Sequence, residues 1–209
     1  MEIEIRNNKF TLHPSGSVFW KEQNVLLISD VHLGKIAHFR KNGLAIPESA
    51  ILENFVRLDE VVELFNPKRI IFLGDLFHSV INNEWHFFAD WVRKTTAEII
   101  LVEGNHDIIA KQHYSDLNIV IHSKLILEDF LLTHHPTESE YYFNFCGHIH
   151  PGIKLKDLGR QALKLACFFN KEKQMILPAF GEFTGNYFLR PQENDRVYAI
   201  ANNEVIKIV

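Results

Sequence analysis

The first half of the chain alternates short apolar runs with segments of helical periodicity. Continuous apolar runs predict buried strands at Val25–Ile28, Arg69–Leu73 and Glu98–Val102. Between them, apolar residues recur at helical spacing from Ile51 to Phe65 and again within Asn83–Thr95. Strands that alternate with helices in this way predict βαβ units, and therefore a sheet with parallel strands.

The two ends of the chain follow a β pattern. Glu2–Ile5 and Lys9–Leu12 alternate apolar and polar residues around an Asn7-Asn8 turn, which predicts a hairpin. In the second half we expect strands at Leu125–Leu132, Tyr142–Cys146, Met175–Leu177, Val197–Ala201 and Val205–Val209. The segment Pro151–Gln161 is expected to be a loop of local basic character, and Pro47 is expected to open the helix that precedes Asn66-Pro67.

Composition narrows the class of protein. With 209 residues, 46% of them hydrophobic and 23% charged, the chain suits one globular α/β domain over residues 1–209. A net charge of −4 provides no global attraction for nucleic acid, so any such attraction must be local or borne by metals. The sequence shows no apolar run of about 20 residues and no secretory signal, and we expect a cytoplasmic protein without membrane contact. Cys146 and Cys167 lie in apolar runs and are expected to be buried free thiols.

Residues that bind metals follow five of the predicted strands. They are Asp30-Val31-His32, Gly74-Asp75, Gly104-Asn105-His106-Asp107, His134 and Gly147-His148-Ile149-His150. Asp-x-His or Gly-Asp alone fits an ordinary surface turn, whereas the clusters Gly104–Asp107 and Gly147–His150 are stronger signals. Together, the ordered set favours a metal site. Residues two apart in an extended segment point to the same side, so one metal can bind both residues of Asp-x-His or His-x-His. Two adjacent divalent metals commonly serve to cleave phosphate esters.

This ordered set resembles the calcineurin-like metallophosphoesterase superfamily. The resemblance implies a four-layer α/β/β/α sandwich with two mixed β-sheets, and a metal-bridging hydroxide that attacks phosphorus in line. It further implies that Asp30, His32 and His150 bind one metal, that Asn105, His134 and His148 bind the other, and that Asp75 bridges them. His106 would be the catalytic histidine. His135 remains the alternative to His134 because the two are adjacent.

One position departs from the superfamily pattern. Many members carry a carboxylate or an amide three residues after the bridging aspartate, where it orients the catalytic histidine. This chain has His78 there. Either His78 has another role, including that of an ordinary core histidine, or Asp107 helps to position His106.

Three further segments are similar to the bacterial ligase-associated DNA-damage-response endonuclease family. They are residues 32–47, 74–79 and 177–185. The resemblance implies manganese-dependent cleavage of phosphodiesters, with a DNA ligase or helicase as a partner in repair. Iron, zinc and nickel remain alternatives for the two divalent metal ions, because they accept the same nitrogen and oxygen ligands.

The loop after His32 carries candidate substrate-binding residues. Lys35, His38 and Arg40 lie within one segment beside a predicted metal ligand, where they can bind phosphate oxygens. Arg40 is the first choice because a guanidinium binds phosphate with two parallel hydrogen bonds. The alternative is a solvated basic loop. The competing functions are a small-molecule phosphatase, a cyclic-nucleotide phosphodiesterase, and a non-catalytic metal-binding repair scaffold, although His106 argues against the last. The oligomeric state stays open.

Overall fold

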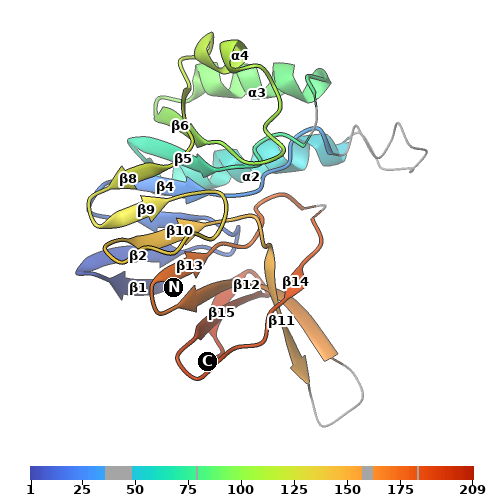
Figure 1. Ribbon diagram of the computed structural model, residues 1–209. Coiled ribbons are helices and arrows are strands. Elements are labelled where there is room, and N and C mark those ends of the chain that lie inside the picture. The colour runs from blue at the N-terminus through green and yellow to red at the C-terminus, as the bar shows by residue number, and fades with distance from the viewer. Residues whose placement is uncertain (36–48, 79, 157–161, 183) are drawn as a thin grey trace.

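Two β-sheets pack face to face in the computed structural model, which describes residues 1–35, 49–78, 80–156, 162–182 and 184–209 (Figure 1). The first sheet has the strand order β1-β2-β3-β4-β5-β6-β7. Its strands are β1 (Glu2–Ile5), β2 (Asn8–Leu12), β3 (Val18–Trp20), β4 (Val25–Ile28), β5 (Arg69–Leu73), β6 (Glu98–Val102) and β7 (Val120–His122). Strands β1 to β4 pair antiparallel, whereas β4 to β7 pair parallel, so this sheet is mixed.

The second sheet is built from the remainder of the chain. Its main order is β14-β11-β12-β13-β10-β9-β8, and β15 and β16 extend it from β12. Its strands are β8 (Leu125–Leu127), β9 (Phe130–Leu132), β10 (Phe143–Cys146), β11 (Pro151–Lys156), β12 (Ala162–Lys171), β13 (Gln174–Ile176), β14 (Tyr187–Phe188), β15 (Arg196–Ala201) and β16 (Glu204–Lys207). Strand β10 lies parallel to β9 and β13, and the other pairs among β8 to β13 are antiparallel.

The described helices cover the outer face of the first sheet (Figure 1). They are α2 (Ser49–Phe65), α3 (Asn83–Lys94) and α4 (Lys111–Ser115). Leu58 of α2 and Phe88 of α3 pack in one cluster with Phe72 of β5. The Asn82 side chain accepts a hydrogen bond from the Glu84 backbone N–H at 2.8 Å, which satisfies an otherwise unpaired group at the start of α3.

A second apolar core fills the space between the sheets. Leu27 and Ile71 from the first sheet meet Phe130, Phe145 and Phe168 from the second, all fully buried. Because helices cover one face of β4 to β6 and the second sheet covers the other, these strands are apolar at successive positions rather than at alternate ones. This is why their sequence signal is a continuous apolar run.

The prediction of an α/β sandwich with two mixed sheets is confirmed, as is the parallel pairing of β4, β5 and β6. Within the described ranges, the outer face of the second sheet carries no helix. It holds a smaller apolar cluster that includes Cys167 and Phe169, against which Leu189 and Ile208 of the tail pack. Both cysteines are buried and free, as expected. No helix in the described ranges is long and apolar enough to cross a membrane.

Several predicted elements need correction. Leu125–Leu132 is not one strand, because Glu128 adopts a left-handed backbone conformation (φ 51°) and turns β8 back onto β9. The prediction of a loop over Pro151–Gln161 is wrong for its first half, which forms β11, whereas residues 157–161 lie outside the described residues. Pro47 also lies outside them, and α2 begins at Ser49. Strands β3, β7, β12 and β14 and the short helix α4 were not predicted.

Candidate metal centre

The predicted metal ligands come together at the carboxyl ends of strands from both sheets. Strand β4 leads into Asp30 and His32, β5 into Asp75, and β6 into Asn105. Strand β9 leads into His134, and β10 into His148 and His150. Backbone hydrogen bonds join these strand ends within each sheet. Asp30 N–H donates to the Gly74 carbonyl at 3.1 Å, and Gly147 N–H donates to the His134 carbonyl at 3.1 Å.

Asp30, His32 and His150 form the first set of donor atoms. The His150 Nε2 atom lies 3.2 Å from Asp30 Oδ1 and 3.2 Å from His32 Nε2, and the last two atoms are 3.9 Å apart. His150 Nδ1–H donates to the Gly185 carbonyl, so the Nε2 lone pair faces its neighbours. Asp30 Oδ1 is buried and has no hydrogen-bond partner in the described residues. Ligand atoms that share a metal at about 2.1 Å are themselves about 3 to 4 Å apart, depending on the angle between them, so this set fits a divalent ion.

Asn105, His134 and His148 form the second set, together with Asp75. His134 Nδ1–H donates to the Leu73 carbonyl at 3.0 Å, which leaves Nε2 as an unprotonated acceptor. This Nε2 lies 3.0 Å from Asn105 Oδ1, 3.1 Å from His148 Nδ1 and 3.5 Å from Asp75 Oδ1. Two oxygen acceptors, from Asn105 and Asp75, therefore face the lone pair of His134 Nε2. A cation bound between them would satisfy all three atoms.

Two buried carboxylates connect the two sets. Ligand atoms of Asp30, Asp75 and His134 all lie within 4.8 Å of one another, and all three residues are buried. Two carboxylates this close, away from water, repel each other strongly unless a cation or a proton lies between them. The grouping therefore suits a pair of metals with Asp75 between them.

Their surroundings keep His32 and His148 neutral, which metal binding requires. Burial lowers the pKa of His32 to about 3, although the charge of Asp30 acts in the opposite direction. Burial, together with the neighbouring His135 and His134, also lowers the pKa of His148. A neutral imidazole offers its lone pair at neutral pH, so these two residues need no proton loss to bind a metal.

Many of the candidate ligands have a left-handed backbone. The positive φ angles belong to Asp30 (54°), His32 (52°), Asp75 (51°), His148 (67°) and His150 (49°). This conformation is uncommon for residues with side chains and costs about 1–3 kcal/mol at a strained site. Such strain concentrates at functional sites, because the surrounding structure must hold it in place.

The glycines that precede the ligands allow close approach. A Cβ atom at Gly74 would lie 2.3 Å from His134 Nδ1, and one at Gly147 would lie 2.3 Å from Asp30 Oδ2. A Cβ at Gly104 would lie 2.4 Å from Asp75 Oδ1. Each glycine thus abuts a candidate ligand from another strand end, and a larger residue would displace that ligand.

His106 lies at the edge of the first donor set. Its backbone N–H donates to Asp75 Oδ1 at 2.8 Å, and its ring centroid is 5.9 Å from that of His32. The ring of His78 packs 4.7 Å from that of His106 and 5.2 Å from that of His32, measured between centroids. His78 therefore lies against the candidate catalytic histidine rather than in the apolar core.

Asp107 ties two loops of the centre together. Its Oδ2 atom accepts hydrogen bonds from Asp75 N–H and Gly104 N–H, both at 2.8 Å, and its Oδ1 accepts one from Phe77 N–H at 3.2 Å. Burial raises the pKa of Asp107 to about 6, while these N–H groups act in the opposite direction. Its carboxylate thus bonds to backbone groups, and it positions His106 only through the chain.

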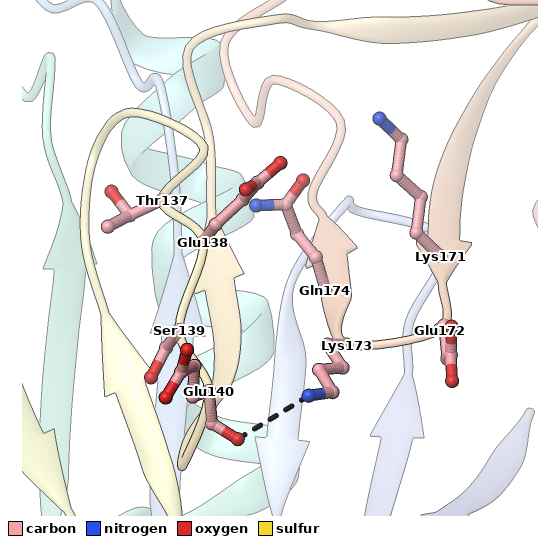
Figure 2. Close-up of a pocket in the computed structure, with 8 residues that line it drawn as sticks. All are labelled: Thr137, Glu138, Ser139, Glu140, Lys171, Glu172, Lys173 and Gln174. Carbon is pink, nitrogen blue, oxygen red and sulfur yellow. Dashed lines mark hydrogen bonds between the residues drawn. The ribbon is translucent and has the colours of Figure 1, made fainter.

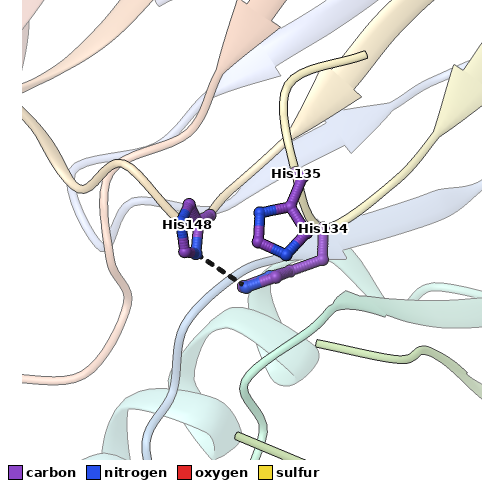
Figure 3. A group of neighbouring side chains, drawn as sticks. All are labelled: His134, His135 and His148. Atoms are coloured by element: carbon purple, nitrogen blue, oxygen red, sulfur yellow. Dashed lines mark hydrogen bonds between the residues drawn. The ribbon is translucent and has the colours of Figure 1, made fainter. Parts of the chain in front are cut away.

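His134 and His135 take different positions (Figure 3). His134 is buried and reaches Asn105, Asp75 and His148. His135 is exposed, and its ring centroid lies 4.1 Å from that of His148. A ring nitrogen of His135 also lies within 4.8 Å of ring nitrogens of His134 and His148.

The backbone carbonyls of Leu73 and Gly185, which orient His134 and His150, could not be recognised from sequence, because every residue type has a backbone carbonyl.

The candidate substrate residues are only partly described. Lys35 lies close to the centre, where burial lowers the pKa of its amine and the charges of Asp30 and Asp75 oppose that change. His38 and Arg40 lie outside the described residues. A separate pocket of about 440 Å³, lined by residues 137–140 and 171–174, lies elsewhere (Figure 2). It adjoins the amino ends of β10 and β13, where Asn144 pairs with Gln174, whereas the candidate ligands follow carboxyl ends.

Comparison with known proteins identifies relatives of the whole chain. The sequence model of the calcineurin-like phosphoesterase family matches residues 23–164. The crystal structure of Pseudomonas putida nuclease MPE is 29% identical in sequence and has a TM-score of 0.85, with 100% of this chain and 99% of that chain covered.

A more distant likeness concerns the fold alone. The phosphoesterase Yfce from E. coli is 16% identical and has a TM-score of 0.50, with 88% of this chain and 97% of that chain covered. No curated protein is significantly similar in sequence.

Proposed function

This chain belongs to the calcineurin-like phosphoesterase family and is a metal-dependent phosphoester hydrolase, and from that premise we propose that it is a dinuclear phosphodiesterase acting on nucleic acid. In this proposal Asp30, His32 and His150 hold one metal. Asn105, His134 and His148 hold the other, Asp75 is shared, and His106 acts on the leaving group.

The convergence of acceptor atoms on two adjacent points carries this proposal. Around one point lie Asp30 Oδ1 and the Nε2 atoms of His32 and His150, at mutual distances of 3.2 to 3.9 Å. Around the other, His134 Nε2 lies within 3.5 Å of oxygens from Asn105 and Asp75. Without cations, these buried nitrogen lone pairs and carboxylates would face one another with too few hydrogen-bond donors between them.

Two divalent ions held here would acidify a shared water and neutralise the charge on phosphoryl oxygens during in-line displacement. The protein contributes the orientation of the donors. Leu73 and Gly185 fix the rings of His134 and His150 through their Nδ1 atoms. In this proposal His106, held through its backbone by Asp75, donates a proton to the leaving oxygen.

The preference for a diester rests on two observations. The nuclease from Pseudomonas putida resembles this chain over its full length, which supports a nucleic acid as substrate. Lys35, close to Asp30 and Asp75, supplies a local positive charge for a phosphate in a chain whose net charge is −4. Phosphate contacts from His38 and Arg40 belong to the proposal as well.

We also propose manganese as the native metal, residues 1–209 as one domain, and a cytoplasmic role in DNA repair with a ligase or helicase as partner. The shared Asp75 and the contribution of both sheets to each donor set support a single domain.

A substrate panel tests the function. The Mn²⁺-loaded protein should hydrolyse bis(p-nitrophenyl) phosphate and single- or double-stranded DNA faster than p-nitrophenyl phosphate or cyclic nucleotides, as measured by kcat/KM. A clear preference for the monoester would replace the proposal with a small-molecule phosphatase.

The proposed role of His106 has its own test. His106→Ala should keep both metals, as measured by elemental analysis, and lose about 10²–10⁴-fold in kcat on the diester. Wild-type turnover in this variant would remove His106 from the mechanism, and absence of all turnover in the wild type would favour the scaffold alternative.

A further inference from the structure

The hairpin of β11 and β12 has two chemically different faces. Ile153 and Leu165 belong to the outer apolar cluster of the second sheet. On the opposite face, Lys154 and Lys164 are exposed, and they pair directly across the hairpin. Successive strand residues point to opposite faces, so both ammonium groups leave the sheet on the side away from this cluster.

This pair of lysines shares one aromatic ring. The Lys154 ammonium lies 4.6 Å and that of Lys164 5.8 Å from the centroid of Phe188 in the adjacent β14. Gly152 makes room for the ring, because a Cβ there would lie 3.0 Å from a Phe188 ring carbon. We call Lys154, Lys164 and Phe188 the basic rung.

The basic rung breaks a rule of sheet pairing. Like charges directly opposite each other destabilise an antiparallel pair, and the attraction of each ammonium for the ring face acts against that repulsion. Local conflicts of this kind are expected where function requires them. An anionic ligand that contacts both ammonium groups would remove the conflict.

The basic rung is continuous with the candidate metal centre. Strand β11 begins directly after His150, and Tyr187 of β14 donates its N–H to the His150 carbonyl at 2.9 Å. The Gly185 carbonyl accepts a hydrogen bond from His150 Nδ1. Lys154 is four residues from His150, about 13 Å along a strand at roughly 3.3 Å per residue, which equals about four nucleotides of a stacked single strand.

We propose that the basic rung binds the sugar-phosphate backbone of a single-stranded nucleic acid whose scissile phosphate occupies the metal centre. This inference rests on the proposed function. The rung is one residue pair wide, so it fits one backbone rather than the two of a duplex. The net charge of −4 disfavours a longer footprint on nucleic acid, so a local contact of this kind must supply the affinity.

A matched pair of double variants tests the proposal. Lys154→Ala/Lys164→Ala removes the rung charges, and Lys94→Ala/Lys124→Ala removes the same charge from exposed lysines on α3 and before β8. Fluorescence anisotropy of a labelled single-stranded oligonucleotide with the Mn²⁺-loaded protein gives Kd over a salt series. The rung variant should bind about tenfold more weakly, and its slope of log Kd against log salt should fall by about 1.4 relative to the control.

Hydrolysis of bis(p-nitrophenyl) phosphate separates this inference from the function on which it rests. Both double variants should keep wild-type kcat/KM on this small diester, which is too short to reach the rung. Equal Kd values and salt slopes in the two double variants, with diester hydrolysis intact, would overturn the inference alone. A larger loss of affinity for duplex than for single-stranded DNA would overturn the assignment to a single strand. A wild type inactive on every diester would overturn the proposed function instead.

Lys164→Glu provides a second, independent measurement. It converts the like-charged pair into an ion pair, so the melting temperature should stay the same or rise. Binding of the oligonucleotide should fall further than in Lys164→Ala, because a carboxylate repels phosphate. Unchanged binding in this folded variant would show that the rung has no ligand of this class.

Discussion

At the scale of single residues, the candidate metal centre combines strained backbone with very close packing. His32 and His150 have φ angles of 52° and 49°, which bulky residues rarely adopt. Gly147 lies so close to Asp30 that no side chain fits between them. The strained backbone lowers the stability of the metal-free protein. Both features hold donor atoms where a metal can bind them.

Gly147→Ala tests the importance of this close approach. The added Cβ would lie 2.3 Å from Asp30 Oδ2 and should displace that carboxylate. We expect loss of at least one metal by elemental analysis and at least tenfold weaker Mn²⁺ binding by calorimetry. Gly185→Ala is the control, because its Cβ would meet no atom within 4 Å. Equal metal content in the two variants would contradict this view of the glycine.

At the scale of elements, the centre depends on loops that are fastened to one another after each strand. Asp107, in the loop after β6, accepts two hydrogen bonds from backbone N–H groups of the loop after β5 and a third from Gly104 of its own loop. The Gly181 N–H similarly donates to the Asp30 carbonyl, so the segment after β13 holds the loop after β4. Strands alone would set the approximate positions of the ligands, and these bonds set their final geometry.

Asp107→Asn should weaken this fastening without touching a metal. An amide presents an NH₂ group to backbone N–H donors that a carboxylate satisfies, so buried donors lose their partners. We expect the free energy of unfolding of the metal-free protein to fall by about 1–3 kcal/mol in urea titrations. Asp90→Asn, at an exposed ion pair with Arg93, should change it by less than about 0.5 kcal/mol. A similar loss in both variants would contradict the argument.

Sequence patterns predicted the central elements well because burial on both faces leaves a strong signal. The strands that deliver Asp30, Asp75 and Asn105 were located from their apolar runs. The turn at Glu128 was missed, because a left-handed backbone at a glutamate has no clear sequence signal. Strand β11 was taken for a loop because of its local basic character, although Lys154 and Lys156 alternate with the apolar Ile153 and Leu155.

The predicted ligands were brought together by the fold, whereas their contacts could not be read from sequence. The Asp75–Asp107 connection, and the packing of His78 on His106, depend on how two loops meet in space. Pairing of Lys154 with Lys164 likewise depends on the register of a hairpin. Whether each candidate ligand binds a metal stays a prediction.

At the scale of the whole molecule, metal binding should stabilise the fold. The donors come from both sheets, and buried carboxylates without a cation are costly. A ligand that binds only the folded protein adds about 2.7 kcal/mol at a hundred times its Kd. For a chain of this length that is a rise in Tm of roughly 5–10 °C.

Asp75→Ala should remove most of this effect. The variant lacks the carboxylate shared by the two donor sets, so at least one metal should be lost by elemental analysis. The rise in Tm on addition of Mn²⁺, measured by calorimetry, should shrink to less than half of the wild-type value. Asp90→Ala should retain the full rise, because Asp90 is exposed and forms an ion pair with Arg93 on the same helix, away from the candidate ligands. Unchanged metal content in Asp75→Ala would refute the shared ligand.

The chain order of the two sheets has a practical consequence. Strands β1 to β7 end at His122 and β8 begins at Leu125, so a single cut between them would separate the sheets without breaking a strand. Each resulting fragment would carry an incomplete set of donors for each of the two candidate sites. Co-expressed halves should therefore reassemble more tightly when Mn²⁺ is present, which would make this fold a metal-gated complementation reporter.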